Sequence, residues 1–215
     1  MSKTEPNRCR LVLAAGPRPG METERVLAAL EGGDVASLVL VQDGAADDDF
    51  QTWAEAIVPA AQAKGVATIV SGDTRVAGRV GADGIHVEES AEAVADAVKR
   101  HQGRLIVGAG GAKTRHDALE LGEAQPDYVF FGRFFYDNQP DPHPRNLGLA
   151  EWWAQIVEVP CIVLGGASVE SVVASAATGA EFVALSSAVF GERDPAEQVR
   201  AANALLDAQA PRFET

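Results

Sequence analysis

The chain alternates between short apolar runs and longer amphipathic segments. The apolar runs cover residues 11–15, 38–42, 67–70, 84–87, 105–108, 128–132, 161–164 and 182–185. Nearly continuous hydrophobic runs of this kind are typical of parallel strands that are covered on both faces. Helical periodicity marks residues 22–30, 50–64, 91–101, 115–123, 149–157, 169–177 and 195–206, and residues 74–80 form a shorter helical segment. This alternation predicts an α/β fold, the (β/α)₈ TIM barrel.

A second regularity concerns the residues that precede the even-numbered strands. An acid stands there each time, following a glycine, an alanine or a proline: Asp34, Asp83, Asp127 and Glu181. Glycine past a helix end supplies the left-handed turn that returns the chain to the barrel floor. An open doubly wound sheet shows the same alternation, but the strand count favours the closed barrel. A length of 215 residues suits a single domain, 1–215.

Composition limits the partners of the chain. The formal net charge of −13 repels phosphate backbones, which argues against nucleic acid as a partner. The apolar runs are far shorter than the ~20 residues of a membrane helix, and the polar N-terminal segment lacks the pattern of a signal peptide, so we expect no membrane association and a cytoplasmic location. Cys9 and Cys161 adjoin strand-like runs and are interpreted as buried small hydrophobes. The sequence leaves open whether the chain forms a homodimer.

The residues that follow the predicted strands are candidates for a site, because barrel enzymes carry their chemistry at the carboxyl-terminal ends of the strands. The strongest signal is in the last two turns. Gly165 and Gly166 follow the seventh strand, and Ser186 and Ser187 follow the eighth. In phosphate-using barrels these two turns bind the anion through backbone N–H groups. The sequence therefore predicts a phosphate-binding site and a phosphorylated small-molecule substrate, although the glycine pair alone would also suit a tight turn.

Other candidates are single side chains. Gln42 follows the second strand, and His86 ends the fourth. Residues 136–146 read as a long loop after the sixth strand, in which Arg145 either reaches over the mouth to pair with a phosphate or stays solvated. Arg133 ends the sixth strand, and its meaning depends on whether it points into the mouth.

Acidic side chains raise the question of a metal. Asp73, Glu88 and Glu89 follow the third and fourth strands and are candidate ligands of Mg²⁺, since they lie near the expected mouth. Glu88 and Glu89 are equally well explained as surface charges. The acidic run 47–49 is interpreted as the start of a helix, where carboxylates meet the positive end of the dipole.

Five segments together resemble one family. Residues 81–86, 127–135, 147–149, 160–167 and 181–190 resemble, in order, motifs of the thiamine phosphate synthase and thiazole tautomerase superfamily. The resemblance runs from about residue 38 to residue 190. It implies a TIM-barrel transferase of thiamine biosynthesis that joins a pyrimidine diphosphate to a thiazole phosphate with the help of Mg²⁺, and it implies catalytic roles for Gln42, His86 and Arg145.

The chain departs from the family pattern at the diphosphate end. Of the Gln-x-Arg-x-Lys motif after the second strand only Gln42 remains. The Asn-Asp pair after the third strand falls on Ser71 and Gly72, with Asp73 adjacent, and the serine after the fifth strand is Gly110. The metal-binding aspartate of the fourth-strand loop has only Glu88 and Glu89 as substitutes, and the lysine of the sixth-strand loop has no counterpart unless Arg145 serves.

Two hypotheses follow. The chain is a thiamine phosphate synthase-like transferase, or it is a catalytically impaired or repurposed barrel that binds a phosphorylated small molecule. A third hypothesis, an isomerase or aldolase, is weaker because no lysine ends a strand to form a Schiff base.

Overall fold

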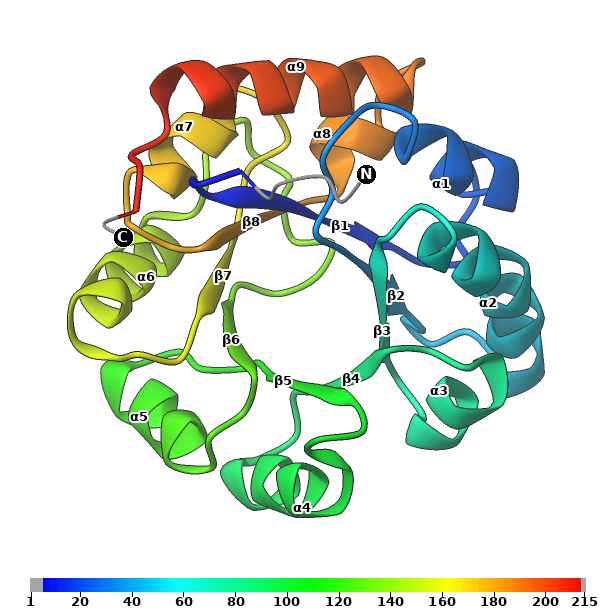
Figure 1. The fold of residues 1–215 in the computed structure, drawn as a ribbon, viewed down its shortest axis with the longest axis horizontal. Coiled ribbons are helices and arrows are strands. Elements are labelled where there is room, and N and C mark those ends of the chain that lie inside the picture. Colours follow the sequence, from blue (N-terminus) through cyan, green and yellow to red (C-terminus); the bar gives the residue numbers. More distant parts are fainter. Residues whose placement is uncertain (1–5, 214–215) are drawn as a thin grey trace.

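The computed structural model describes residues 6–213, in which eight parallel strands close into a ring (Figure 1). The strands are β1 (Arg10–Ala15), β2 (Ser37–Val41), β3 (Ala67–Ser71), β4 (Gly84–Val87), β5 (Ile106–Ala109), β6 (Tyr128–Phe131), β7 (Cys161–Leu164) and β8 (Phe182–Leu185). Each strand pairs with its neighbour in sequence, and β8 pairs with β1. The closed barrel is thus confirmed over the open sheet. Residues 1–5, part of the segment expected to lack a signal peptide, lie outside the described residues.

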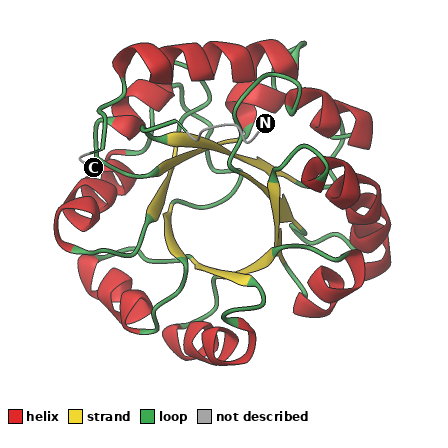
Figure 2. Cartoon of the chain, in the orientation of Figure 1, coloured by secondary structure: helices red, strands yellow, loops and turns green. Residues whose placement is uncertain are grey.

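Helices surround the ring on the outside (Figure 2). They are α1 (Thr23–Ala29), α2 (Asp47–Gln62), α3 (Thr74–Val80), α4 (Ala91–His101), α5 (Arg115–Glu123), α6 (Pro144–Ile156), α7 (Ser171–Ala176), α8 (Ser187–Phe190) and α9 (Pro195–Gln209). Within the described chain, no helix has the length and apolarity to span a membrane. The acidic run 47–49 forms the first turn of α2, where the sequence predicted a helix start.

One boundary differs from the sequence-based prediction. We expected a loop up to residue 146 and a helix from residue 149, but α6 begins at Pro144. Proline fits the first helical position because its fixed φ suits a helix and its missing N–H is not needed there. The side chain of His143 caps the helix by accepting a hydrogen bond from the Arg145 backbone N–H at 3.1 Å. Arg145 is therefore a residue of the first helical turn.

Strand residues alternate between two apolar clusters. In β1, Leu11 and Leu13 pack toward the helices, whereas Val12 and Ala14 pack inside the barrel. The inner cluster is aromatic on the β6 side, where Tyr128 fills the barrel interior. Cys9 and Cys161 are buried free thiols, as predicted, and burial raises the pKa of each thiol.

Three of the four acids before the even strands bind the backbone of the strands that precede them, whereas Asp34 pairs with the Arg10 side chain of β1. The carboxylate oxygens of these three acids accept from the second amide of β3 (to Asp83), the second amide of β5 (to Asp127) and the first amide of β7 (to Glu181), at 2.7, 2.7 and 2.8 Å. For Asp83, burial alone would raise the pKa, but hydrogen bonds from Thr68 and Gln62 hold it below its usual value. These carboxylates join neighbouring strands at the amino-terminal end of the barrel.

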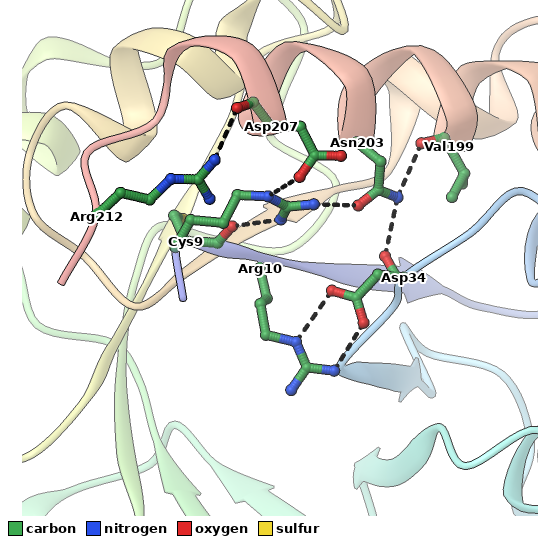
Figure 3. Close-up of polar contacts among 8 residues, drawn as sticks. Cys9, Arg10, Asp34, Val199, Asn203, Asp207 and Arg212 are labelled. Atoms are coloured by element: carbon green, nitrogen blue, oxygen red, sulfur yellow. Dashed lines mark hydrogen bonds and ion pairs between the residues drawn. The ribbon is translucent and has the colours of Figure 1, made fainter. Parts of the chain in front are cut away.

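A buried arginine, Arg8, fastens the N-terminal segment to α9 at the same end. Figure 3 shows its partners Asn203 and Asp207 on that helix. The Arg8 side chain is 2% exposed, and its guanidinium donates to Asp207 Oδ1 at 2.7 Å, to the Cys9 carbonyl at 2.8 Å and to Asn203 Oδ1 at 3.0 Å. The Asn203 amide in turn donates to the Asp34 carbonyl at 3.0 Å. One cluster thus connects β1, the approach to β2, and α9.

Candidate functional site

A cavity of about 720 Å³ lies at the carboxyl-terminal ends of β2, β3 and β4. Its lining includes Ser71 at the end of β3 and His86 from β4. Gln42, Asp73 and Phe134 join them from the loops after β2, β3 and β6. This is the end of the barrel at which active sites of the fold are found. The cavity therefore defines the mouth as the candidate site.

The imidazole of His86 is held inside the barrel between two polar partners. Its Nδ1 lies 3.0 Å from the Tyr128 hydroxyl, and its Nε2 lies 3.3 Å from Glu88 Oε1. Burial, assisted by the negative charge of Glu88, raises the pKa of Tyr128, so its hydroxyl keeps its proton at neutral pH. That hydroxyl can donate to Nδ1 while Nε2–H points to Glu88. His86 is thereby fixed in one orientation at the cavity wall.

Aromatic rings complete the surroundings of His86. The ring stacks on Tyr128 at an interplanar angle of 13° and meets Phe130 and Phe134 edge-on. Two glycines of the β5 region make room for this group. A Cβ on Gly108 would lie 2.0 Å from the Tyr128 ring, and a Cβ on Gly110 would lie 2.6 Å from His86 Nε2. The missing serine at position 110 is therefore explained, since a side chain there would collide with the histidine.

Gln42 lies at the mouth, as predicted, with its amide engaged by the chain. Its Nε2 donates to the Ala45 carbonyl at 3.0 Å and to Asp47 Oδ1 at 2.7 Å, and its Oε1 accepts from the Asp73 N–H at 3.1 Å. A Cβ on Gly72 would lie 2.5 Å from Gln42 Oε1, so glycine at that position is needed for this arrangement. Gln42 thus ties together the loops after β2 and β3.

The three acids predicted from the sequence as Mg²⁺ ligands, Asp73, Glu88 and Glu89, do not form a common site. Asp73 is bound by the Arg75 side chain at 2.9 and 3.1 Å, and hydrogen bonds from Arg75 lower its pKa to about 2. Glu88 faces His86, and Glu89 is exposed. Among residues 6–213 there is no group of three or more histidine, cysteine or acidic side chains that could hold a metal ion. The carboxylates as placed do not fit a protein-built Mg²⁺ site.

The turns after β7 and β8 lie at the mouth end of the barrel, but their amides already have acceptors in the chain. Gly165 N–H donates to the Ala184 carbonyl and Gly166 N–H to Ser171 Oγ, both at 2.9 Å. Ser187 N–H donates to the carboxylate of Asp137 at 2.6 Å. Ser186 is buried, with 2% of its surface exposed. The acceptor at Ser187 is thus itself an anion.

That anion belongs to the segment 136–141 of the loop after β6, which we call the strap. The strap carbonyls of Gln139 and Pro140 accept from the N–H groups of Ala167 and Ser168, at 2.7 and 3.3 Å. A Cβ on Gly166 would lie 2.1 Å from the Pro140 oxygen, so the strap rests directly on the glycine turn. The strap thus contacts both turns that the sequence assigned to phosphate.

The cations near the mouth differ in their placement. Arg145 is exposed on the first turn of α6 and is not part of the cavity lining. Arg133 does line the cavity, and its guanidinium lies 4.6 Å from the centre of the Tyr136 ring. Arg18, from the loop after β1, lies over the Phe135 ring at 3.5 Å and forms an ion pair with Asp43. The sequence prediction left the direction of Arg133 open, and the structure places it at the mouth.

Two residues of this region were missed by sequence reasoning. Tyr128 read as part of an apolar strand, and its role follows only from the alternation in β6 that points it inward toward His86. Asp137 read as one polar residue of a long loop. A buried acid within that proline-rich segment has no distinguishing sequence signal, because its burial depends on where the loop lies.

The chain forms a closed (β/α)₈ barrel with a polar mouth and with glycine and serine turns after its last two strands. These features place it in the class of barrels whose site lies at the carboxyl ends of the strands. The family model described as thiamine monophosphate synthase matches residues 10–189. The chain belongs to this family, as its resemblance predicted.

Individual relatives agree. The chain is 34% identical to a thiamine-phosphate synthase of Hyphomonas neptunium over 212 residues, covering 94% of this chain and 96% of the relative. It is also 34% identical to one of Rhodospirillum centenum, over 85% of this chain and 89% of the relative. A solved thiamine phosphate pyrophosphorylase from Pyrococcus furiosus superposes with a TM-score of 0.79 over 94% of this chain and 97% of that chain. At 22% identity this last likeness supports the fold.

Proposed function

We propose that the chain is a thiamine-phosphate synthase that joins a pyrimidine diphosphate to a thiazole phosphate at the barrel mouth. The observation that carries the proposal is that the family match, residues 10–189, contains every strand and loop that forms the mouth. The proposal includes a cytoplasmic location and phosphorylated small molecules as substrates.

The reaction breaks the bond between the pyrimidine methylene carbon and the diphosphate oxygen. Pyrophosphate leaves with the bonding electron pair, and the thiazole nitrogen uses its lone pair to form the new carbon–nitrogen bond. The cation formed in between must be kept from water, and an apolar aromatic wall serves that purpose. Phe134 lines the cavity, and Phe130 and Tyr128 pack with it around His86. His86 is buried with both ring nitrogens engaged, so it acts as a positioning residue that fixes Glu88 and the aromatic wall, and Gln42 ties together the loops after β2 and β3.

Mg²⁺ enters the proposal only as an expectation from the family. The metal would stabilise a leaving diphosphate by neutralising its charge. Asp73 is already paired with Arg75, and Glu88 and Glu89 do not converge with a third ligand, so we assign no step to a bound ion. The rate of thiamine phosphate formation is therefore to be measured over a range of Mg²⁺ concentrations.

One observation favours the second candidate, a barrel that binds a phosphorylated ligand without catalysing the transfer. Two of the arginines near the mouth are committed to carboxylates within the chain, Arg18 to Asp43 and Arg75 to Asp73. Cations that are neutralised in this way cannot fully balance a departing diphosphate.

An assay of thiamine phosphate formation from the two substrates, with and without Mg²⁺, tests the first candidate. We expect formation above background, and we expect His86→Gln to lose most of it while His116→Gln, a matched change on the exposed face of α5, does not. Absence of product at all Mg²⁺ concentrations refutes the synthase. Binding of thiazole phosphate by the same preparation would then support the second candidate.

The two candidate cations can be separated by the same assay. Arg145 is the cation that sequence reasoning proposed, whereas Arg133 is the one that lines the cavity. We expect Arg133→Ala to lower the rate more than Arg145→Ala. The reverse order would mean that the first turn of α6 swings over the mouth when substrate binds.

A further inference from the structure

Asp137 is a buried acid that the proposed reaction does not use. Only 4% of its surface is exposed, and it lies in the loop between β6 and α6. Its Oδ2 accepts from the Ser187 N–H at 2.6 Å, whereas its Oδ1 is buried without a hydrogen-bond partner among the described residues. Buried carboxylates are normally paired with a cation or fully hydrogen-bonded, because a half-satisfied charge costs free energy. Burial raises the pKa of this carboxyl above its usual value, although the hydrogen bond from Ser187 partly offsets the rise, so its charged form is poorly accommodated at this place.

The rest of the strap is held by weaker means. Its hydrogen bonds to the turn after β7 are two backbone ones, from Ala167 to Gln139 and from Ser168 to Pro140, beside the close packing on Gly166. Asn138, Gln139, Pro140 and Asp141 are exposed on the surface. Phe135, directly before the strap, has a φ of 63°, which is unfavourable for a bulky residue. Segments with few buried apolar contacts and exposed hydrogen bonds are those that open locally at low cost.

A route to the covered turn exists beside it. A hollow of about 350 Å³ is lined by Ser186 and Ser187 and by three charged residues, Arg18, Glu22 and Arg25. Arg25 donates to the carbonyl of Phe190 at 2.9 Å. The charge of Arg25 is thus not neutralised by any carboxylate recorded among the described residues. Of the charged residues that line the hollow, Arg18 is paired with Asp43 and Glu22 is itself an acid, so Arg25 is the cation that can attract an anion there.

We propose that Asp137 is an internal stand-in for phosphate: its carboxylate and the strap close the turns after β7 and β8, and a phosphoryl ligand binds by displacing them. The inference rests on the proposed function, since it takes these turns as the place of the phosphoryl group. It adds that phosphate competes with a carboxylate of the chain itself. The apparent affinity is then the intrinsic affinity reduced by the fraction of molecules in which the strap is open.

The charge of Asp137 can be removed with little change of shape. Asp137→Asn keeps a carbonyl acceptor for Ser187 but removes the charge that holds the strap closed and repels phosphate. Since hydrogen bonds to charged groups are the stronger ones, we expect the Kd for inorganic phosphate to fall by about tenfold or more. Asp141→Asn is the matched control, because it removes the same charge from an exposed position of the same strap.

Calorimetric titration of inorganic phosphate into the full chain and both variants tests this. Tighter binding by Asp137→Asn but not by Asp141→Asn supports the proposal. Unchanged or weaker binding by Asp137→Asn overturns it, and so does absence of phosphate binding in all three proteins. These outcomes are independent of thiamine phosphate formation, so a protein can pass one test and fail the other.

Amide exchange followed by NMR gives a second readout on the unaltered chain, which is needed if Asp137→Asn does not fold. Saturating phosphate should speed exchange at Ala167 and Ser168, because they lose the strap carbonyls. Ser187 should stay protected, because phosphate replaces the carboxylate. Phosphate binding that leaves exchange at Ala167 and Ser168 unchanged would overturn the proposal.

Discussion

Replacing Arg8 by methionine should weaken the amino-terminal end of the barrel while leaving the mouth intact. Methionine retains much of the apolar stem but has no donor. Asn203 Oδ1 and the Cys9 carbonyl would each lose the donor that now reaches them at 3.0 and 2.8 Å. Asp207 would lose its ion pair, but this residue is 62% exposed and water can replace the arginine there.

The size of the effect follows from this asymmetry. Each buried acceptor left without a donor costs about 1–3 kcal/mol, and removal of the buried charge itself offsets part of that loss. We therefore expect Arg8→Met to lower the free energy of unfolding by about 2–4 kcal/mol. Asp207→Asn keeps an oxygen for the Arg8 guanidinium at an exposed position, and it should cost less than about 1 kcal/mol.

Urea unfolding followed by circular dichroism and by tryptophan fluorescence measures both variants. The transitions seen by the two probes must coincide for these free energies to be defined. The reasoning is refuted if Arg8→Met unfolds at the same urea concentration as the unaltered chain, or if Asp207→Asn is as destabilising as Arg8→Met. The second result would mean that the exposed ion pair, not the buried hydrogen bonds, holds the N-terminal segment.

Three further outcomes are expected. Gly110→Ala should push the His86 ring aside and lower synthase kcat/KM by about tenfold to a hundredfold, since small misplacements of positioned groups are costly. An unchanged kcat/KM would show that the position of His86 does not matter for the reaction. Asp127→Ala should leave the buried Val107 N–H without its acceptor and cost about 1–3 kcal/mol in urea unfolding, with faster amide exchange at Val107 as the local sign. The pKa of Asp83 is lower in the folded chain than its ordinary value of 3.8, so its contribution to stability is present above that pH and is lost as the pH falls through the lowered pKa. The difference in unfolding free energy between the unaltered chain and Asp83→Asn should narrow on acidification, and a constant difference from pH 7 downward would contradict this sign.

The sequence predicts the strands well because parallel strands buried on both faces leave continuous apolar runs. The start of α6 was placed too late, because Pro144 follows two other prolines and reads as loop until His143 is seen to cap it. The acids before the even strands were recognised as a repeat, but their acceptor role requires the closed barrel that brings Asp127 to Val107.

The site was predicted only in outline. The structure has Gln42, His86 and the last two turns at the mouth end, since strand ends converge there in any such barrel, and their roles stay predictions. Sequence reasoning could not reveal that the Arg75 side chain donates hydrogen bonds to Asp73. Nor could it reveal that the Ser187 N–H donates to the carboxylate of Asp137. Both contacts depend on loop conformations, which local patterns do not determine.

The carboxylates of Asp83, Asp127 and Glu181 influence which parts of this sequence can vary in evolution without loss of the fold. They hold strands together at one rim, and they are not among the residues that line the cavity at the other. Loops at the mouth can then be exchanged, lengthened or stripped of charge without touching the contacts that keep the ring shut. The absence of the two family cations after β2 is an alteration of this kind, because it leaves the contacts at the other rim unchanged. Grafting mouth loops from a relative onto this barrel should therefore yield a folded protein.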